Sequence, residues 1–292
     1  MAEAKGVLAE AEEMAMKRTG VIAAALAAGL LLALASPAGA AQCGRGPDGF
    51  DDWLQGFKQE AAQAGISRSV IDRALYNVSY DENVISHDRG QRAFGQSFAT
   101  FSSRHITAYG LKKGRNLMRR YAEPLQQIEQ RYGVPGQVLI AIWGLETGFG
   151  STTGKFDTLS ALATLAYDCR RTEKFHEELI AALKIIQRGD LSPGQMRGAW
   201  AGEIGQTQFM PTSYLKYATS IGGGDSGDLI HSPEDALAST ANFLHAKGWQ
   251  RGQGWDEGQP NFQALLQWNA ATVYTKTIAL FADKIGGDQA SE

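Results

Sequence analysis

Apolar residues recur at spacings of three and four along most of the chain, the pattern of helices with one buried face. The first such segment begins at Phe50 and carries Trp53, Leu54 and Phe57 on its apolar side. A second, shorter helix is expected after Ser67, because serine is a favoured N-cap residue. Strand-like alternation is scarce, so the pattern predicts a mainly α protein.

Two further segments carry less regular patterns. Residues 88–101 place three phenylalanines at helical spacing, which predicts one helix with inward-packed rings. Residues 115–132 predict a charged amphipathic helix that is interrupted near Pro124, because proline lacks a backbone donor. Residues 41–49 are rich in glycine and polar residues, and we expect a mobile start there.

The most apolar segment follows Gly133-Val134-Pro135, where proline suits the first turn of a new helix. Residues 136–146 are apolar almost all round, and a helix of that kind is buried. Residues 189–205 read as a loop and residues 222–227 as a flexible turn. The remaining helices are expected at 159–167, 172–187, 211–218, 232–247, 262–268 and 271–285.

The overall charge is close to neutral. The 292 residues carry a formal net charge of −3, with 43% hydrophobic and 20% charged residues. Such a chain has neither the broad basic surface of a nucleic-acid-binding protein nor a polybasic stretch for an anionic membrane. A polymer of low or mixed charge is the better match as a substrate.

The N-terminus has the three-part layout of a secretory signal peptide: basic Lys17-Arg18, an apolar run over 21–35 and a small-residue stretch over 36–40. We therefore expect residues 1–40 to be removed on export. The alternative is a membrane anchor, but the run is shorter than the roughly 20 residues that span a bilayer. The residues before Cys43 do not form a lipid-attachment site.

If the chain is exported, its two cysteines enter a compartment where they can be oxidised. Cys43 and Cys169 could form a disulfide in an oxidising compartment, although nothing in the sequence places them close together. Two isolated cysteines and five scattered histidines make no zinc-type spacing.

Glu146 is the residue with the most suggestive setting, because it closes the apolar helix beside Trp143, Leu145 and Phe149. A carboxyl in apolar surroundings keeps its proton to higher pH, and a protonated carboxyl is what glycosidic cleavage needs. Gly148 and Gly150 would leave room for a substrate beside it. The alternative is a structural glutamate paired with a lysine or arginine, and position alone favours that alternative.

A second segment, residues 201–214 (AGEIGQTQFMPTSY), gathers glycines, amides, a ring and a thioether at a loop-to-helix junction. Gln208 could hydrogen-bond a sugar hydroxyl or acetamide, and Phe209 could stack on a sugar face. Residues 148–155 look superficially like a phosphate loop, but Phe156 stands where a Mg²⁺-binding Ser or Thr is needed.

Together these segments resemble the B-type lytic murein transglycosylases (glycoside hydrolase family 103). The resemblance is carried by 143–150 (WGLETGFG), 159–167, 205–214 (GQTQFMPTSY) and 268–274 in order and spacing, within roughly residues 50–285. It implies a goose-lysozyme-like helical core over 133–285, with an added N-terminal helical part over 50–132, a small irregular insert and a tail over 286–292.

The resemblance also implies a function: non-hydrolytic cleavage of the MurNAc–GlcNAc bond of peptidoglycan in the periplasm, with a 1,6-anhydro-MurNAc product. Glu146 matches the family's single catalytic acid and base. Residues that match the family's glycan-binding positions are Gln208, Phe209, Met210, Asn269 and Tyr274, with Phe101 a looser match. The expected partners are glycan strands and transient cell-wall machinery, with no nucleic acid, cofactor or stable oligomer.

Some positions depart from the family pattern. Ala199 stands where a serine is common, Glu203 where a small apolar residue is usual, and Gln206 where histidine is frequent. For Glu203 we favour a solvated loop residue over an added polar contact. An Asp-rich calcium loop of some relatives is reduced here to residues 220–224, so we expect no bound metal.

Two alternative functions remain open at this point. One is a hydrolytic muramidase of similar fold, which product mass would distinguish because an anhydro end lacks one water. The other is a peptidoglycan-binding protein that has lost activity, which the departures at Ala199 and Glu203 suggest and the retained Glu146 argues against.

Overall fold

The computed structural model describes residues 42–90 and 96–287, and Cys43–Glu292 form one unit by their internal contacts. The predicted signal peptide over 1–40 lies outside the described residues, as does Phe94. None of the helices described is both long and apolar enough to span a bilayer. The division at residue 133 into an accessory part and a core stays a prediction.

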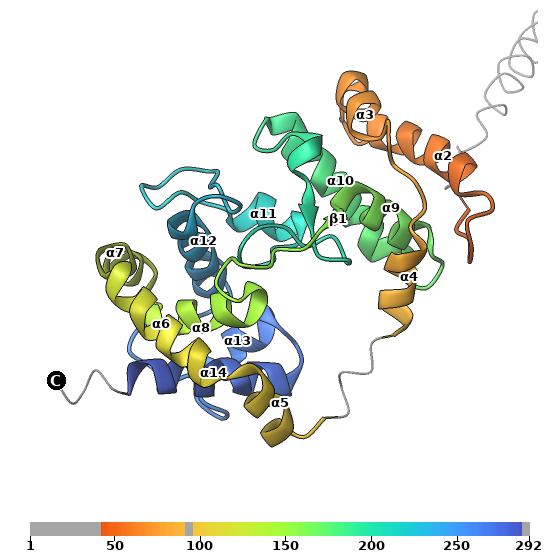
Figure 1. The fold of residues 1–292 in the computed structure, drawn as a ribbon. Helices are drawn as coiled ribbons and strands as arrows, with labels where there is room; N and C mark the ends of the chain where they lie inside the picture. The colour runs from red at the N-terminus through yellow and green to blue at the C-terminus, as the bar shows by residue number, and fades with distance from the viewer. Residues whose placement is uncertain (1–41, 91–95, 288–292) are drawn as a thin grey trace, which may run out of the picture. The chain divides into compact units, whose positions relative to one another are not determined.

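Helices dominate the described residues (Figure 1). Those of the first half are α2 (Phe50–Gln63), α3 (Arg68–Ala74), α4 (Glu82–Arg89), α5 (Phe98–His105), α6 (Ala108–Arg120), α7 (Ala122–Tyr132) and α8 (Gly136–Thr147). Those of the second half are α9 (Thr158–Tyr167), α10 (Thr172–Arg188), α11 (Pro211–Tyr217), α12 (Pro233–Ala246), α13 (Phe262–Trp268) and α14 (Thr272–Gly286). Two short strands, β1 (Phe156–Asp157) and β2 (Arg197–Gly198), pair antiparallel.

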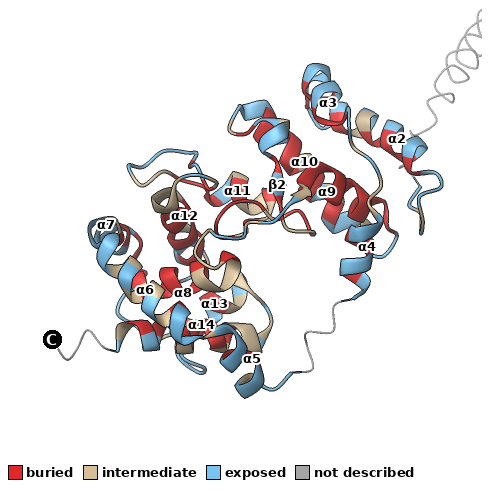
Figure 2. Ribbon diagram, viewed as in Figure 1, coloured by how far each residue is buried: buried red, intermediate tan, exposed pale blue. Residues whose placement is uncertain are grey.

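Helix α8 is surrounded by other helices, as its sequence predicts. It packs against α14, α6, α12 and α7, and eight of its twelve residues are buried while none is exposed (Figure 2). Val138, Ile140 and Ile142 have no exposed surface. Each such side chain contributes roughly 1.5–3 kcal/mol on burial. This packing fixes the helix whose last turn carries Glu146.

A second buried helix, α9, packs along α10 and is covered by α2 and α4. All ten of its residues are buried. An aromatic cluster joins it to α2, with ring centroids 5.5 Å apart for Phe50 and Tyr167 and 5.4 Å apart for Trp53 and Phe57. The apolar face predicted from Phe50 is thus the face that docks α2 on α9.

The segment over 41–49, which we expected to be mobile, is joined to the end of α9 by several contacts. Cys43 forms a disulfide with Cys169, which settles the question that the sequence left open. The Gly44 N–H donates to the Tyr167 carbonyl at 2.9 Å, and the Tyr167 hydroxyl donates to the Asp48 carbonyl. A side chain at Gly44 would collide with the Tyr167 ring, so this close approach requires glycine.

Three expected segments are also corrected. The single helix over 88–101 is wrong, because α4 ends at Arg89 and α5 begins after Ser97, whose hydroxyl caps it. The break expected near Pro124 falls at Tyr121, and proline sits in the first turn of α7, where no donor is lost. The expected loop over 189–205 holds a 3-10 turn and strand β2.

Candidate active site

A pocket of ≈ 450 Å³ lies at the end of α8. It is lined by Glu146, Ala199, Glu203, Gln208, Phe209, Met210, Ser213, Phe243, Gln267, Trp268 and Asn269. Two larger surface hollows, of ≈ 580 and ≈ 610 Å³, hold none of these residues. The pocket therefore brings together three segments that the sequence marked separately: the end of α8, the 201–214 segment and the 268–274 segment.

Glu146 lies in the last turn of α8 and is half-buried, with its carboxyl open to the pocket and protein around the rest. One carboxyl oxygen, Oε1, accepts two hydrogen bonds: from Trp268 Nε1 at 2.9 Å and from the Tyr274 hydroxyl at 2.8 Å. Both donors come from the C-terminal helices. The structural alternative, a pairing with Lys or Arg, is not what the described residues show.

The pKa of Glu146 is raised to about 7, mainly by burial. The two hydrogen bonds from Trp268 and Tyr274 act in the opposite direction and lower the pKa, but by less. The nearby carboxyl of Glu203 raises the pKa further. The group can therefore hold a proton near neutral pH and also release it. A general acid works best when its pKa is near the working pH.

Glu203 is not the solvated loop residue that we favoured from the sequence. It lines the same pocket, and its Oε2 is buried without a hydrogen-bond partner among the described residues. Burial raises the pKa of Glu203, while the backbone N–H groups of Glu203 and Ala201 lower it. The sequence pattern could not predict that Glu203 is buried, because the hairpin around it causes the burial and not an apolar periodicity.

Thr147 joins the end of α8 to the 205–214 segment. Its buried hydroxyl donates to the Gln206 carbonyl at 2.6 Å and accepts from the Gly150 N–H at 2.8 Å. Phe149 and Gln208 are the non-glycine residues with positive φ in the described parts of the chain, at 64° and 57°. Side chains rarely adopt this conformation, and such strain clusters at functional sites.

The three predicted residues of the second segment all line the pocket, but in different ways. Gln208 Nε2 donates to the Gly205 and Thr153 carbonyls at 2.9 and 3.1 Å, so its amide is held in place by the backbone. The ring of Phe209 is buried and packs edge-on against Trp268, which makes it a wall of the pocket more than an open stacking surface. Met210 precedes α11 as its N-cap.

The C-terminal residues are also brought to the site. Asn269 lines the pocket, and its Oδ1 accepts from the Ala271 N–H at 3.0 Å. Tyr274 instead contacts Glu146 directly, and Phe101 packs behind it with ring centroids 6.1 Å apart. Sequence reasoning missed Trp268 as a donor to Glu146, although its place directly before Asn269 in the resembling motif was a signal.

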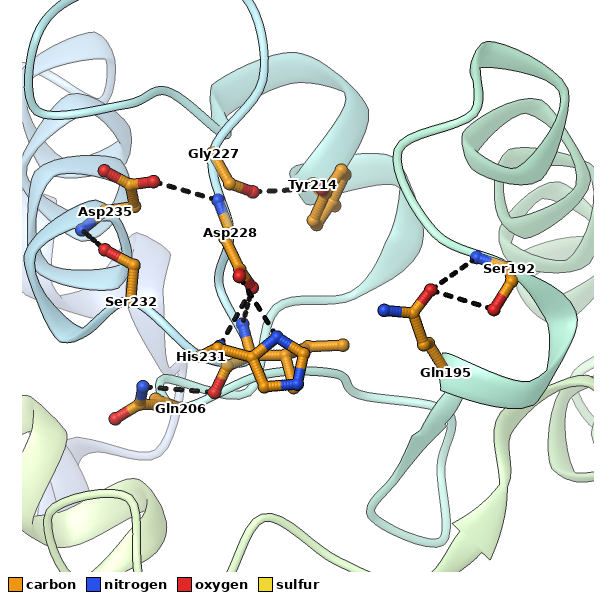
Figure 3. A network of polar contacts seen from close by, with 10 residues as sticks. Ser192, Gln195, Gln206, Tyr214, Gly227, Asp228, His231, Ser232 and Asp235 are labelled. Atoms are coloured by element: carbon orange, nitrogen blue, oxygen red, sulfur yellow. Dashed lines mark hydrogen bonds and ion pairs between the residues drawn. The ribbon is translucent and has the colours of Figure 1, made fainter.

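The loop between α11 and α12 is hydrogen-bonded to the segment that lines the pocket. Figure 3 shows the Gln206 side chain at the edge of this loop, where its Nε2 donates to the Ile230 carbonyl at 3.1 Å. The Asp228 carboxylate accepts from the backbone N–H groups of Ile230 and His231 at 3.0 and 2.8 Å. The Gln206 backbone N–H also donates to the Leu229 carbonyl at 2.8 Å, so this loop holds the segment that carries Gln208.

The aspartates near residues 220–224, where some relatives have a calcium loop, bind the backbone of this loop. The two oxygens of Asp235 accept from the Ile221 and Asp228 N–H groups at 2.9 and 3.0 Å. Within the described ranges, no group of three or more His, Cys, Asp or Glu is arranged to hold a metal ion. These carboxylates fold the loop, and Asp225 is exposed beside them.

Comparison with known families gives a match over most of the chain. A family model described as the transglycosylase SLT domain matches residues 49–259. The membrane-bound lytic murein transglycosylase B of Escherichia coli (strain K12) is 36% identical over 153 residues, which cover 52% of this chain. The match spans 42% of that relative, less than half its length.

Solved structures are similar as well. SltB3 from Pseudomonas aeruginosa in complex with NAG-anhNAM-pentapeptide is 32% identical, with a TM-score of 0.77 over 82% of this chain and 80% of that chain. The Escherichia coli lytic transglycosylase Slt35 in complex with bulgecin A is 24% identical, with a TM-score of 0.72 over 82% and 94% of the two chains. The second likeness shows the fold alone. Together these matches confirm the predicted fold class and the resemblance.

Proposed function

The chain belongs to the transglycosylase SLT domain family, and we propose that it is a lytic transglycosylase of peptidoglycan in which Glu146 is the catalytic acid and base. One observation carries the proposal: a carboxyl with a pKa of about 7 opens into a pocket and is held there by two donors on one oxygen. Such a group can give a proton and then take one back at the same pH.

In the first step, protonated Glu146 donates its proton to the glycosidic oxygen of a MurNAc–GlcNAc bond. The bond between that oxygen and the anomeric carbon of MurNAc breaks, and the GlcNAc hydroxyl leaves. The substrate's own acetamide carbonyl can stabilise the anomeric carbon from the other face. The hydrogen bonds from Trp268 and Tyr274 stabilise the carboxylate that Glu146 becomes.

In the second step, the Glu146 carboxylate takes the proton of the MurNAc 6-hydroxyl as that oxygen attacks the anomeric carbon. A bond between O6 and C1 forms, the product is the 1,6-anhydro sugar, and Glu146 is protonated again. No water is consumed. An intramolecular hydroxyl has a large proximity advantage over a water molecule.

The pocket residues supply the binding part of the proposal. Gln208 and Asn269 place side-chain amides at the wall, Met210 adds apolar surface, and the buried Phe209 ring backs the wall from behind. Two structures of SltB3 from Pseudomonas aeruginosa are complexes with NAG-anhNAM-pentapeptide and with NAG-NAM-pentapeptide. We assign glycan strands of the same chemistry as the substrate of this chain.

A second candidate function has one observation in its favour. Glu203 puts another carboxyl in the pocket, and ordinary hydrolytic glycosidases use two carboxyl groups. A hydrolytic muramidase would leave reducing ends, whereas a lytic transglycosylase would leave anhydro ends. The family match and the likeness to SltB3 favour the lytic reaction over the hydrolytic one.

The test is digestion of purified sacculi by the wild type, Glu146→Gln and Glu178→Gln, with mass spectrometry of the released muropeptides. Glu178 is a buried carboxyl on α10 that binds Thr212 and does not line the pocket, so it controls for loss of any buried glutamate. We expect anhydromuropeptides from the wild type and the control, and a loss of at least 10³-fold in Glu146→Gln. Reducing ends from the wild type would support the muramidase, and unchanged release by Glu146→Gln would remove the catalytic assignment.

We further propose that the chain acts in the periplasm after export. The Cys43–Cys169 disulfide supports an oxidising compartment. The curated relative is named membrane-bound, and none of this chain's described helices could serve as a bilayer span. Fractionation of cells that express the full chain tests the location, and a cytoplasmic protein with free thiols would contradict it.

A further inference from the structure

The backbone at Glu203 is fixed from both sides. The Ala199 N–H donates to the Glu203 carbonyl at 3.1 Å, and Ile204 exchanges hydrogen bonds of 2.9 Å with Phe209. A Cβ at Gly198 would lie 1.7 Å from the Glu203 carbonyl oxygen, so only glycine allows this approach. With its backbone held in this way, the Glu203 side chain lines the pocket as a built feature of the hairpin.

The side chain carries an unmet hydrogen-bonding group. Glu203 Oε2 is buried and has no partner among the described residues, and a buried polar atom in this state costs roughly 1–3 kcal/mol. The charged groups around it are Glu146 across the pocket, and Glu178 and Lys174 on α10. The two carboxyl oxygens of Glu178 accept hydrogen bonds from the N–H and the hydroxyl of Thr212, and Lys174 is exposed. A ligand in the pocket, in place of the water that it displaces, can supply the partner.

We propose that Glu203 hydrogen-bonds the acetamide group of the sugar that binds beside Glu146, and so determines specificity for N-acetylated sugars. The inference rests on the proposed function, because the pocket must bind a glycan for it to apply. An amide N–H can only donate and points in a fixed direction, whereas a hydroxyl rotates and keeps its bond to water. A buried acceptor in a fixed place therefore selects for the amide. In its protonated form, the carboxyl would donate to the acetamide carbonyl instead.

Two tetrasaccharides separate the acetamide contact from contacts to hydroxyls. Chitotetraose carries an acetamide on every ring, and cellotetraose carries a hydroxyl at the same carbon. Binding of each is measured by calorimetry in Glu146→Gln, which cannot turn over, and in the double variant with Glu203→Ala. We expect Glu146→Gln to prefer chitotetraose, and the double variant to lose roughly tenfold or more of that preference.

Two further variants make the readout specific. Glu203→Gln keeps a polar group of the same shape, so we expect it to retain much of the preference in the same background. Glu173→Ala removes an exposed glutamate of α10 that does not line the pocket, and should leave the preference unchanged. Near-UV circular dichroism checks that each variant is folded.

Two results would overturn the inference: no preference for chitotetraose in Glu146→Gln, or an unchanged preference after Glu203→Ala, whether neither sugar is weakened or both are weakened equally. Equal weakening would place the contact on a hydroxyl. Failure of the proposed function looks different, because the wild type would then release no anhydromuropeptides from sacculi. Anhydro products together with an unchanged preference would reject the role of Glu203 and leave Glu146 as the acid.

Discussion

Replacing Tyr274 by phenylalanine tests how the site sets the ionisation of Glu146. The change removes one of the two donors to Oε1 and keeps the ring, the packing on Phe101 and the Trp268 donor. In the wild type, the hydrogen bond from Tyr274 stabilises the Glu146 carboxylate relative to the neutral acid. Its removal therefore raises the pKa of Glu146 above its present value of about 7.

The size of this effect follows from the contact. A hydrogen bond to a charged group is worth about 1.5–3 kcal/mol, and one pKa unit corresponds to about 1.4 kcal/mol. Water in the pocket replaces part of the lost bond, so we expect a rise of about one unit. The free enzyme must hold the proton to act as an acid, and activity at low substrate falls as pH passes the pKa of Glu146. The alkaline limb of the pH profile should thus move up by about one pH unit.

The assay is the initial rate of anhydromuropeptide release at low sacculus concentration, from pH 5 to pH 10. Tyr214→Phe is the matched control, because its hydroxyl also makes one hydrogen bond, to the Gly227 carbonyl at 3.0 Å, and neither donates to Glu146 nor lines the pocket. We expect the control to keep its alkaline limb in place, even if it loses stability. An alkaline limb that stays in place or moves down in Tyr274→Phe would refute the reasoning.

Three further predictions concern stability and the link between segments. Because the pKa of Glu146 is raised, its ionisation costs stability as pH rises from about 4.5 to about 7. Glu146→Gln should therefore be more stable than the wild type by about 3 kcal/mol at pH 8 and by much less at pH 4, in urea unfolding. An equal difference at both pH values would contradict this sign. Replacing Cys43 and Cys169 by serine opens a disulfide between residues 126 apart and should cost about 3–5 kcal/mol in the same assay, whereas a cost near zero would mean that the link is absent in solution. Thr147→Val leaves the Gln206 carbonyl without its donor, and we expect a loss of about 1–3 kcal/mol together with lower activity; full activity would show that this hydrogen bond does not position the pocket.

The fold could be predicted well wherever burial alone sets the structure. Helix α8 is apolar all round, and the structure buries it among four other helices. The boundaries that failed are set by local chemistry that competes with the apolar pattern. Ser97 caps a new helix inside a stretch with helical spacing, and Pro124 fits the first turn of α7 without breaking it.

Other features depend on distant parts of the chain. The segment after Gln42 looked mobile because its anchors, Tyr167 and Cys169, lie more than a hundred residues away. The burial of Glu203 depends on a hairpin that the local sequence reads as loop. The motif resemblance predicted that Glu146 and Tyr274 belong to the same site, but it did not predict the hydrogen bond from the Tyr274 hydroxyl to the Glu146 carboxyl.

The central claim is that Glu146 holds a proton near neutral pH in a pocket that binds glycan. Its titration can be followed directly by ¹³C NMR of glutamate side-chain carboxyls in the full chain, with the Glu146→Gln spectrum to identify its signal. We predict a midpoint at about 7, well apart from the exposed glutamates. A midpoint near 4.5 would show an ordinary carboxylate and contradict the assignment of Glu146 as the acid.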